Sequence, residues 1–226
     1  LAPAEVAVER FKDNEFDPLG NQTKDFRMDR TVYDYNGKWV VCKFRPISSP
    51  LRAAYRDDVF VYTYRGADLY FMLAEAFNQL GRRAVIDALI NVGVSGYISE
   101  FDVNEEGTYS GNWYGFTPHW TNASTVASRK YGDKGIRGTG VSYSGLGSRT
   151  FTSDKQNNDE EILKEMMLEM ACEGKVYPAM IRMAKRYNDN SFMAKYISEK
   201  YETTGNAEDI RSKIMNGDYF IKWNLK

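Results

Sequence analysis

The spacing of apolar residues predicts two consecutive helices near the middle of the chain. An apolar stripe recurs every three or four positions over residues 67–80 and consists of Tyr70, Leu73, Ala74, Phe77 and Leu80. Gly81 follows at once, where glycine ends a helix without strain. A second stripe predicts a helix over 83–93 and consists of Val85, Ile86, Leu89 and Ile90. Together they form a tight helical hairpin of the tetratricopeptide-like kind, which needs stacked neighbours to bury its stripes.

The C-terminal third of the chain carries further helical periodicity. It predicts helices over 159–173, 178–187, 191–202 and 207–216. Asn158 with Glu161 three positions later is typical of a helix start, so Asn158 is the expected N-cap. This interpretation puts Asp159 and Glu161 in the first turn, where the helix dipole favours carboxylates. Asn206 is the expected cap of the last helix.

Two segments depart from helical periodicity. Residues 30–44 predict a β-hairpin, because Asn36-Gly37 supplies the two positive φ angles of a type I′ turn between apolar runs. Residues 95–157 combine glycines with many aromatics and show no helical period. Such a long irregular segment is usually functional or disordered, and its large aromatics argue against disorder. The expected fold is therefore mainly α, with a long aromatic- and glycine-rich loop region and a small β-hairpin.

Composition excludes several classes of protein. The 226 residues include 30 Lys and Arg against 31 Asp and Glu, with no run of like charge. A nucleic-acid surface would need a clustered basic face, so no nucleic-acid partner is expected. No apolar run approaches the ~20 residues of a membrane helix. The two cysteines, Cys42 and Cys172, are too few for a disulfide framework and are expected to be free, packed thiols.

Motifs for catalysis are weak. His119 is the single histidine of the chain, so a zinc site would lack further His or paired Cys ligands, and a Ser-His-Asp site would depend on this one residue. A glycosidase needs two converging carboxylates, which the sequence does not locate. We therefore expect no catalysis, no bound metal and no cofactor.

Three acidic residues lie on predicted helices beside apolar faces: Glu75, Glu169 and Glu173. Each belongs either to a polar helix face or to a buried ion pair. Arg65 and Arg182 are possible partners.

An aromatic cluster within the irregular segment is the candidate ligand site. It consists of Tyr109, Asn112, Trp113, Tyr114, His119 and Trp120. Flat aromatic rings can recognise the apolar C–H faces of sugars while polar neighbours fix orientation. The alternative is that these rings pack the loop onto the helices, as side chains of Ω-loops do. Both interpretations stay open at this point.

Two segments carry a resemblance to a known family. The first contains Tyr64-Arg65-Gly66-Ala67-Asp68, then Ala74-Glu75-Ala76 and Leu80-Gly81. The second contains Ile162-Leu163-Lys164-Glu165, then Leu168-Glu169-Met170-Ala171-Cys172-Glu173-Gly174-Lys175, and the basic run Arg182-Met183-Ala184-Lys185-Arg186. Together they resemble the SusD/RagB family of outer-membrane nutrient-binding lipoproteins of Bacteroidetes, in its RagB-like branch. The likeness is clearest over 60–93 and 158–226.

The resemblance implies a function without catalysis. It implies capture of an oligosaccharide, or of a peptide in the RagB-like branch, and delivery to a TonB-dependent SusC-like transporter. Residues 1–226 would be the C-terminal portion of a surface-exposed lipoprotein of the outer membrane. They would form a single domain that is incomplete without an N-terminal half, which would also carry the lipid anchor. A helical-repeat scaffold that binds a protein partner is the alternative from another class, which the hairpin at 67–93 alone would permit.

Overall fold

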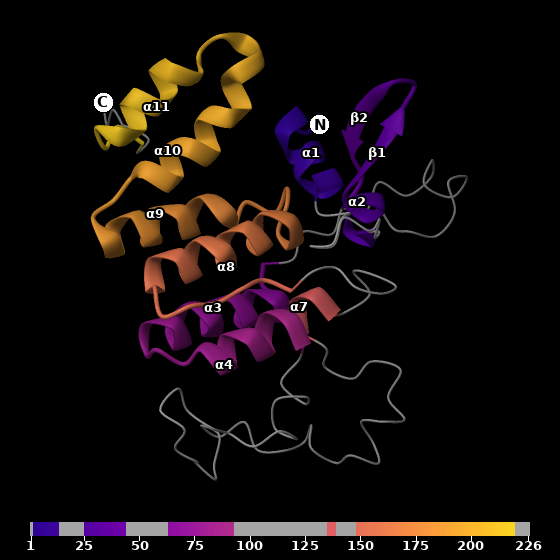
Figure 1. Ribbon diagram of the computed structural model, residues 1–226. Coiled ribbons are helices and arrows are strands. Elements are labelled where there is room, and N and C mark those ends of the chain that lie inside the picture. The colour runs from indigo at the N-terminus through magenta and orange to yellow at the C-terminus, as the bar shows by residue number, and fades with distance from the viewer. Residues whose placement is uncertain (1, 14–24, 44–62, 93–134, 139–147, 220–226) are drawn as a thin grey trace, which may run out of the picture.

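Stacked helices make up most of the computed structural model, which describes residues 2–13, 25–43, 63–92, 135–138 and 148–219 (Figure 1). One layer consists of α3 (Gly66–Gln79), α4 (Arg83–Asp87), the π-helical turn η1 (Ala88–Val92) and the short α7 (Gly135–Gly138). The next layers are α8 (Lys155–Glu169) with α9 (Val176–Tyr187), then α10 (Ser191–Ser198), the 3-10 helix η2 (Glu199–Thr204) and α11 (Ala207–Met215). Beside them lie α1 (Glu5–Asp13), α2 (Phe26–Thr31), β1 (Val32–Tyr35) and β2 (Lys38–Val41). The expectation of a mainly helical fold with a small hairpin is confirmed.

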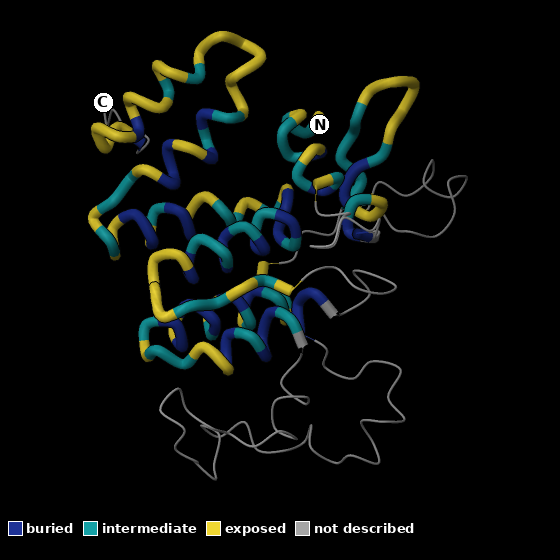
Figure 2. Tube along the Cα trace, in the orientation of Figure 1, coloured by how far each residue is buried: buried dark blue, intermediate teal, exposed yellow. Residues whose placement is uncertain are grey.

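The main hydrophobic core lies where these layers meet (Figure 2). Phe71 of α3, Leu89 of η1 and Ile162 of α8 are each at most 1% exposed. Met183 of α9 and Met193 of α10 extend the same cluster. All residues of the predicted stripes over 67–93 except Leu80 face buried neighbours, which α8 supplies to α3 and α7 supplies to η1.

The outer face of α3 is apolar as well. Leu69, Met72 and Leu80 are 59%, 54% and 64% exposed. Their spacing of three and eight positions places them on one side of the helix, away from the core. Within the described residues α3 thus carries a second apolar stripe that solvent reaches.

Both ends of α3 follow from its sequence. The backbone N–H of Arg65 donates to the carboxylate of Asp68 at 2.8 Å, which satisfies a donor at the helix start. At the other end Gly81 has a φ of +72°. The N–H of Gly81 then donates to Asn78 O at 3.0 Å and that of Arg82 to Phe77 O at 2.9 Å. This is a Schellman motif, and it confirms the expected role of Gly81.

The β-hairpin is also confirmed. β1 and β2 pair antiparallel with Tyr35 opposite Lys38. Asn36 and Gly37 have φ values of 53° and 78°, as a type I′ turn requires.

The predicted start of α8 is wrong. Asp154 is the N-cap, and its side chain accepts from the N–H groups of Gln156 and Asn157. Asn158 instead lies inside the helix, 1% exposed, where it bonds Asn78 and both backbone groups of Thr152. The expected first-turn position of Asp159 is wrong for the same reason, since Asp159 is buried in the helix.

Five further expectations need correction. The helix expected over 83–93 leaves α-geometry at Ala88 and continues as a π-helical turn. Residues 191–202 end in the 3-10 turns of η2, and α8 stops at Glu169, not at 173. The segment 95–157, expected to be irregular, includes the helical turn α7 and the start of α8. Cys172 is exposed in a turn with a φ of 66°, whereas a packed thiol was expected.

Candidate functional site

The six residues of the predicted aromatic site all lie outside the described residues. These are Tyr109, Asn112, Trp113, Tyr114, His119 and Trp120. Their role as ligand-binding residues stays a prediction. The described residues do contain a pocket and three networks of charged side chains.

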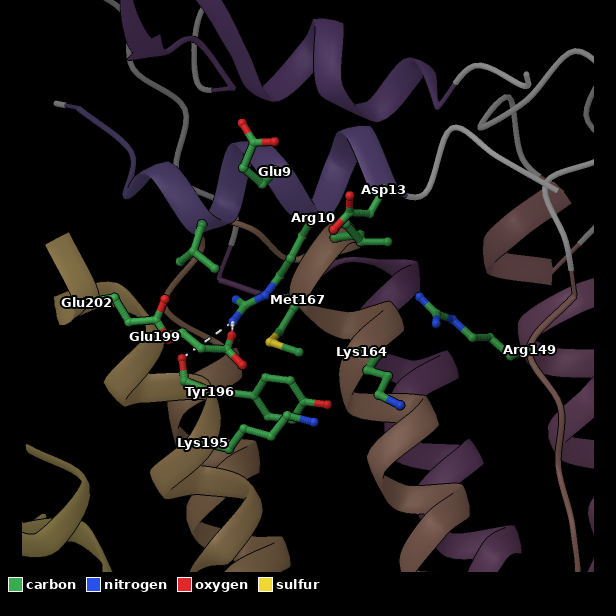
Figure 3. Close-up of a pocket in the computed structure, with 12 residues that line it drawn as sticks. Glu9, Arg10, Asp13, Arg149, Lys164, Met167, Lys195, Tyr196, Glu199 and Glu202 are labelled. Carbon is green, nitrogen blue, oxygen red and sulfur yellow. Dashed lines mark hydrogen bonds and ion pairs between the residues drawn. The ribbon is translucent and has the colours of Figure 1, made fainter. Parts of the chain in front are cut away.

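The pocket lies between α1, α8, α10 and η2 and has a volume of about 560 Å³ (Figure 3). This volume falls within the range of small-molecule sites, roughly 300–1,000 Å³. Apolar contacts come from Val6, Met167 and Leu168. The other lining residues are Tyr196 together with four acidic and four basic side chains, namely Glu9, Asp13, Glu199, Glu202, Arg10, Arg149, Lys164 and Lys195. The pocket is therefore dominated by charge.

Charges of both signs line this pocket, and Arg10 and Lys195 lie beside its acidic end. Figure 3 shows Glu199 and Glu202 of η2 at one end, and Lys164 of α8 with Arg149 at the other. In the described part of the chain Glu202 forms no ion pair. Lys164 bonds Glu161 at 2.5 Å, a carboxylate that lies outside the lining.

Tyr196 lies in the pocket between cations. The guanidinium carbon of Arg10 lies 5.4 Å from its ring centroid and the ammonium of Lys195 lies 5.0 Å from it. Its hydroxyl donates to Glu160 at 2.6 Å. Burial and this carboxylate raise the pKa of Tyr196, so the phenol stays protonated as a hydrogen-bond donor. Arg10 is itself fixed by Glu199 at 2.5 Å.

A fully buried carboxylate, Glu165 of α8, lies behind this pocket and holds three arginines. Arg27 of α2 approaches one oxygen at 2.6 Å, while Arg137 of α7 and Arg149 approach the other, Arg149 at 2.9 Å. Asp25, also fully buried, holds the other side of the Arg27 guanidinium at 2.8 Å. We call these five residues the Glu165 cluster.

The arginines of the Glu165 cluster control its ionisation. Burial would raise the pKa of Glu165, but the charges of Arg27, Arg137 and Arg149 outweigh burial and lower it to about 2. Because Arg27 and Arg137 are themselves buried, the cluster has little access for a substrate. Its role is therefore structural, because it connects α2, α7, α8 and the segment that contains Arg149.

Asn91 explains how Arg149 reaches the Glu165 cluster. The Asn91 amide donates to Arg149 O at 2.9 Å, and its oxygen accepts from the N–H of Arg149 at 2.9 Å. Asn91 also donates to Asp87 one turn earlier at 2.7 Å. The π-helical turn η1 therefore presents Asn91 to the segment that carries Arg149. Such π-helical turns often occur at functional sites.

Arg65 connects the start of α3 to the end of α8. Its guanidinium lies 2.6 Å from Glu169 and 2.8 Å from Glu173. Lys43, just after the hairpin, approaches Glu173 at 2.7 Å. Burial would raise the pKa of Glu173, but its bonds to Arg65 and Lys43 lower it. Arg65, one of the two possible partners inferred from the sequence, thus pairs with two of the three carboxylates.

A third charge network joins α3, α8 and α9. Arg182 lies 2.6 Å from Glu75, and Arg186 bridges Glu75 at 3.1 Å and Asp159 at 2.5 Å. Arg182, the other possible partner inferred from the sequence, thus pairs with Glu75, the third of the carboxylates. Burial raises the pKa of Asp159 despite its bonds to Asn78, Tyr187 and Arg186.

Sequence reasoning missed the Glu165 cluster and the pocket. Glu165 lies three positions after the buried Ile162, and this spacing indicates that its carboxylate needs a buried cation. No comparable signal identifies Arg27 or Arg137, because each is far from Glu165 in the sequence. The pocket residues come from four separate parts of the chain, and nothing in any one of them marks a site.

The described residues contain no group of three or more His, Cys, Asp or Glu side chains that could hold a metal ion. None of the helices among these residues is long and apolar enough to cross a membrane. Comparison with protein-family models, curated proteins and solved structures found no match for this chain. Its function therefore has to be argued from its own residues.

Proposed function

We propose that this chain is part of a non-catalytic nutrient-binding protein of the SusD/RagB type. In this proposal it captures an oligosaccharide, or alternatively a peptide, at the bacterial outer membrane and delivers it to a TonB-dependent SusC-like transporter. The membrane is reached through a lipid anchor on an N-terminal part.

One observation carries the proposal: the two segments that resemble the family form one unit by pairing their charges. Arg65 of the first segment pairs with Glu169 and Glu173 of the second. Glu75 of the first pairs with Arg182 of the second. Residues of the two motifs that bond to one another support the interpretation of both segments as parts of one family pattern better than two separate coincidences would.

A helical-repeat scaffold for a protein partner is the second candidate. The exposed apolar side chains of Leu69, Met72 and Leu80 on α3 favour it, since an apolar face on a helical hairpin can pack against a further helix. This face is also compatible with the first proposal, where an N-terminal half would supply the neighbouring helices.

Calorimetric titration of the intact protein against a panel of oligosaccharides and a panel of peptides tests the proposal. Saturable binding of a member of either panel is expected, and mass spectrometry should recover that ligand unchanged, because no catalysis is proposed. The transporter should co-purify with the protein from the outer membrane. Turnover of the ligand, or binding of protein partners with no binding in either panel, would refute it.

Variants of the aromatic cluster test where a captured glycan binds. Trp113→Ala or Trp120→Ala should weaken binding by about 1–3 kcal/mol, by analogy with the loss of base–aromatic stacking. The helical circular dichroism should stay the same. A lowered melting temperature with unchanged affinity would instead assign these rings to packing.

A further inference from the structure

The solvent-exposed side of α3 carries no charged residue. The two charged residues of this helix, Asp68 and Glu75, are each only 5% exposed. The exposed positions, which continue to the residue after the helix, are apolar or small: Gly66, Leu69, Met72, Ala76 and Leu80. A surface helix usually presents its charged residues to water and buries its apolar ones. This side of α3 therefore has the pattern of a helix face that packs against another element.

The residues on this side have the spacing of a coiled-coil seam. Five of them follow one another at alternating intervals of three and four positions: Gly66, Leu69, Leu73, Ala76 and Leu80. Such a heptad spacing keeps the residues on one side of a helix and allows a second helix to pack along its length. Leu73 is half-buried, and the other four residues are exposed. We call these five residues the α3 seam.

Gly66 is a small residue that the described part of the chain does not require. Its φ lies outside the left-handed region that favours glycine. A Cβ added at this position would meet no heavy atom within 4 Å among the described residues. Glycine also weakens a helix relative to alanine, and it is useful where a group from outside approaches the backbone closely. A large side chain that packs onto Gly66 from outside the chain would account for the glycine.

A second copy in the antiparallel direction fits the order of large and small residues in the α3 seam. When two α3 helices overlap fully in opposite directions, Leu80 of one copy lies beside Gly66 of the other. Leu69 and Ala76 face each other in the same way, and Leu73 lies at the twofold axis. Each large side chain at the ends of the seam thus meets a small one. A parallel copy would place every residue beside itself, which leaves gaps at Gly66 and Ala76.

We propose that two copies of this chain associate through the α3 seam as an antiparallel, twofold-symmetric pair. Because the seam is uncharged, identical faces meet without repulsion between like charges. With 14 residues α3 is about 21 Å long. Each copy then offers on the order of a few hundred Å², below the roughly 800 Å² per partner of a stable dimer. The area fits a weak, reversible dimer.

Sedimentation equilibrium of the intact protein, from about 10 μM to about 1 mM, covers the Kd range of a weak dimer. A monomer–dimer equilibrium is expected. Gly66→Leu should weaken the dimer about tenfold, because the new side chain meets Leu80 of the other copy, and Leu80→Ala should do so by leaving a gap over Gly66. The combined variant exchanges the large and the small residue. Its Kd should return to within about threefold of the parent value.

Two controls separate association from folding. Gly66→Leu and Leu80→Ala should both keep the helical circular dichroism of the parent, because Gly66 has open space around it and Leu80 is 64% exposed. Met215→Ala is the matched control for Leu80→Ala. Met215 is also apolar and 49% exposed, but it lies at the end of α11, outside the α3 seam. Met215→Ala should leave the Kd of the dimer unchanged.

Self-association is independent of ligand capture, so each can fail without the other. A protein that stays monomeric up to about 1 mM overturns the dimer and leaves a helix from another protein or from a longer form of this chain as the occupant of this face. A dimer that neither Gly66→Leu nor Leu80→Ala weakens overturns the assignment to the α3 seam. Weakening by both single variants without recovery in the combined variant overturns the antiparallel arrangement.

Discussion

Replacement of Glu165 by glutamine should be among the most damaging single changes in this protein. Glutamine keeps the shape but leaves the guanidinium groups of Arg27, Arg137 and Arg149 without their shared negative charge. Its amide nitrogen also presents a donor where the carboxylate offers an acceptor to arginine donors. Loss of one partner from a buried charge network costs roughly 3–5 kcal/mol.

The lowered pKa of Glu165 gives a second, independent value for the stability that its charge contributes. A fall from an ordinary 4.5 to about 2 corresponds to about 3 kcal/mol of stabilisation at neutral pH. Because the folded pKa lies below the unfolded one, this contribution is present above pH 4.5 and is lost as the pH falls from 4.5 through 2. The two magnitudes agree, and both exceed the usual effect of a surface substitution, about 0.5 kcal/mol.

Urea unfolding followed by helical circular dichroism measures both effects. At pH 7 the urea concentration at the unfolding midpoint should be lower for Glu165→Gln than for the parent. The slope of the unfolding free energy against urea concentration should stay unchanged. Between pH 4.5 and 2 the variant should lose less stability than the parent, since it lacks the group that titrates. Glu208→Gln, at a 90% exposed carboxylate, is the control and should behave like the parent. A cost below about 1 kcal/mol for Glu165→Gln, or an unchanged pH dependence, would refute the reasoning.

Two further predictions concern other parts of the fold. Burial raises the pKa of Asp159, so its charged form is disfavoured, and any stability from this group is present below pH 3.8 and lost as the pH rises through the raised pKa. Asp159→Asn should therefore cost less than Glu165→Gln in the same urea assay at pH 7, and an equal or larger cost would contradict the sign of the shift. Leu69→Gln combined with Met72→Gln should leave the melting temperature nearly unchanged, because both side chains are exposed, and should reduce self-association in analytical sedimentation. Unchanged association in that double variant would mean that the outer face of α3 is not a contact surface.

Prediction from the sequence succeeded where local chemistry alone decides the structure. The apolar stripe of α3, Gly81 after it and the Asn36-Gly37 turn each depend on neighbouring residues, and all three agree with the structure apart from Leu80, which is exposed. The start of α8 was misplaced because Asp154 and Asn158 both have side chains suited to an N-cap. Only the contact of Asn158 with Asn78, from another helix, decides between them.

Contacts between distant segments explain the other misses. The π-helical turn at 88–92 accompanies hydrogen bonds between Asn91 and Arg149. The spacing of apolar residues cannot predict such bonds. Two of the partners of Glu165 come from α2 and α7. The first is a short helix in a segment whose sequence is polar, and the second is a single helical turn. The aromatic cluster around Trp113 is a different case, since it lies outside the described residues and stays a prediction.

Ligand binding in the pocket can be tested at Lys164 without loss of the fold. Glu165, Glu169 and Glu173 follow one another at intervals of four residues and tie α8 and the turn after it to α2, α3 and the hairpin. The pocket uses another face of α8, where Lys164 is a third exposed and, among the described residues, pairs with Glu160 and Glu161 of its own helix. Substitution of Lys164 therefore removes a surface charge whose pairs are worth roughly 0–1 kcal/mol. A large effect of that substitution on ligand affinity would have to come from the pocket itself, not from a disturbed scaffold.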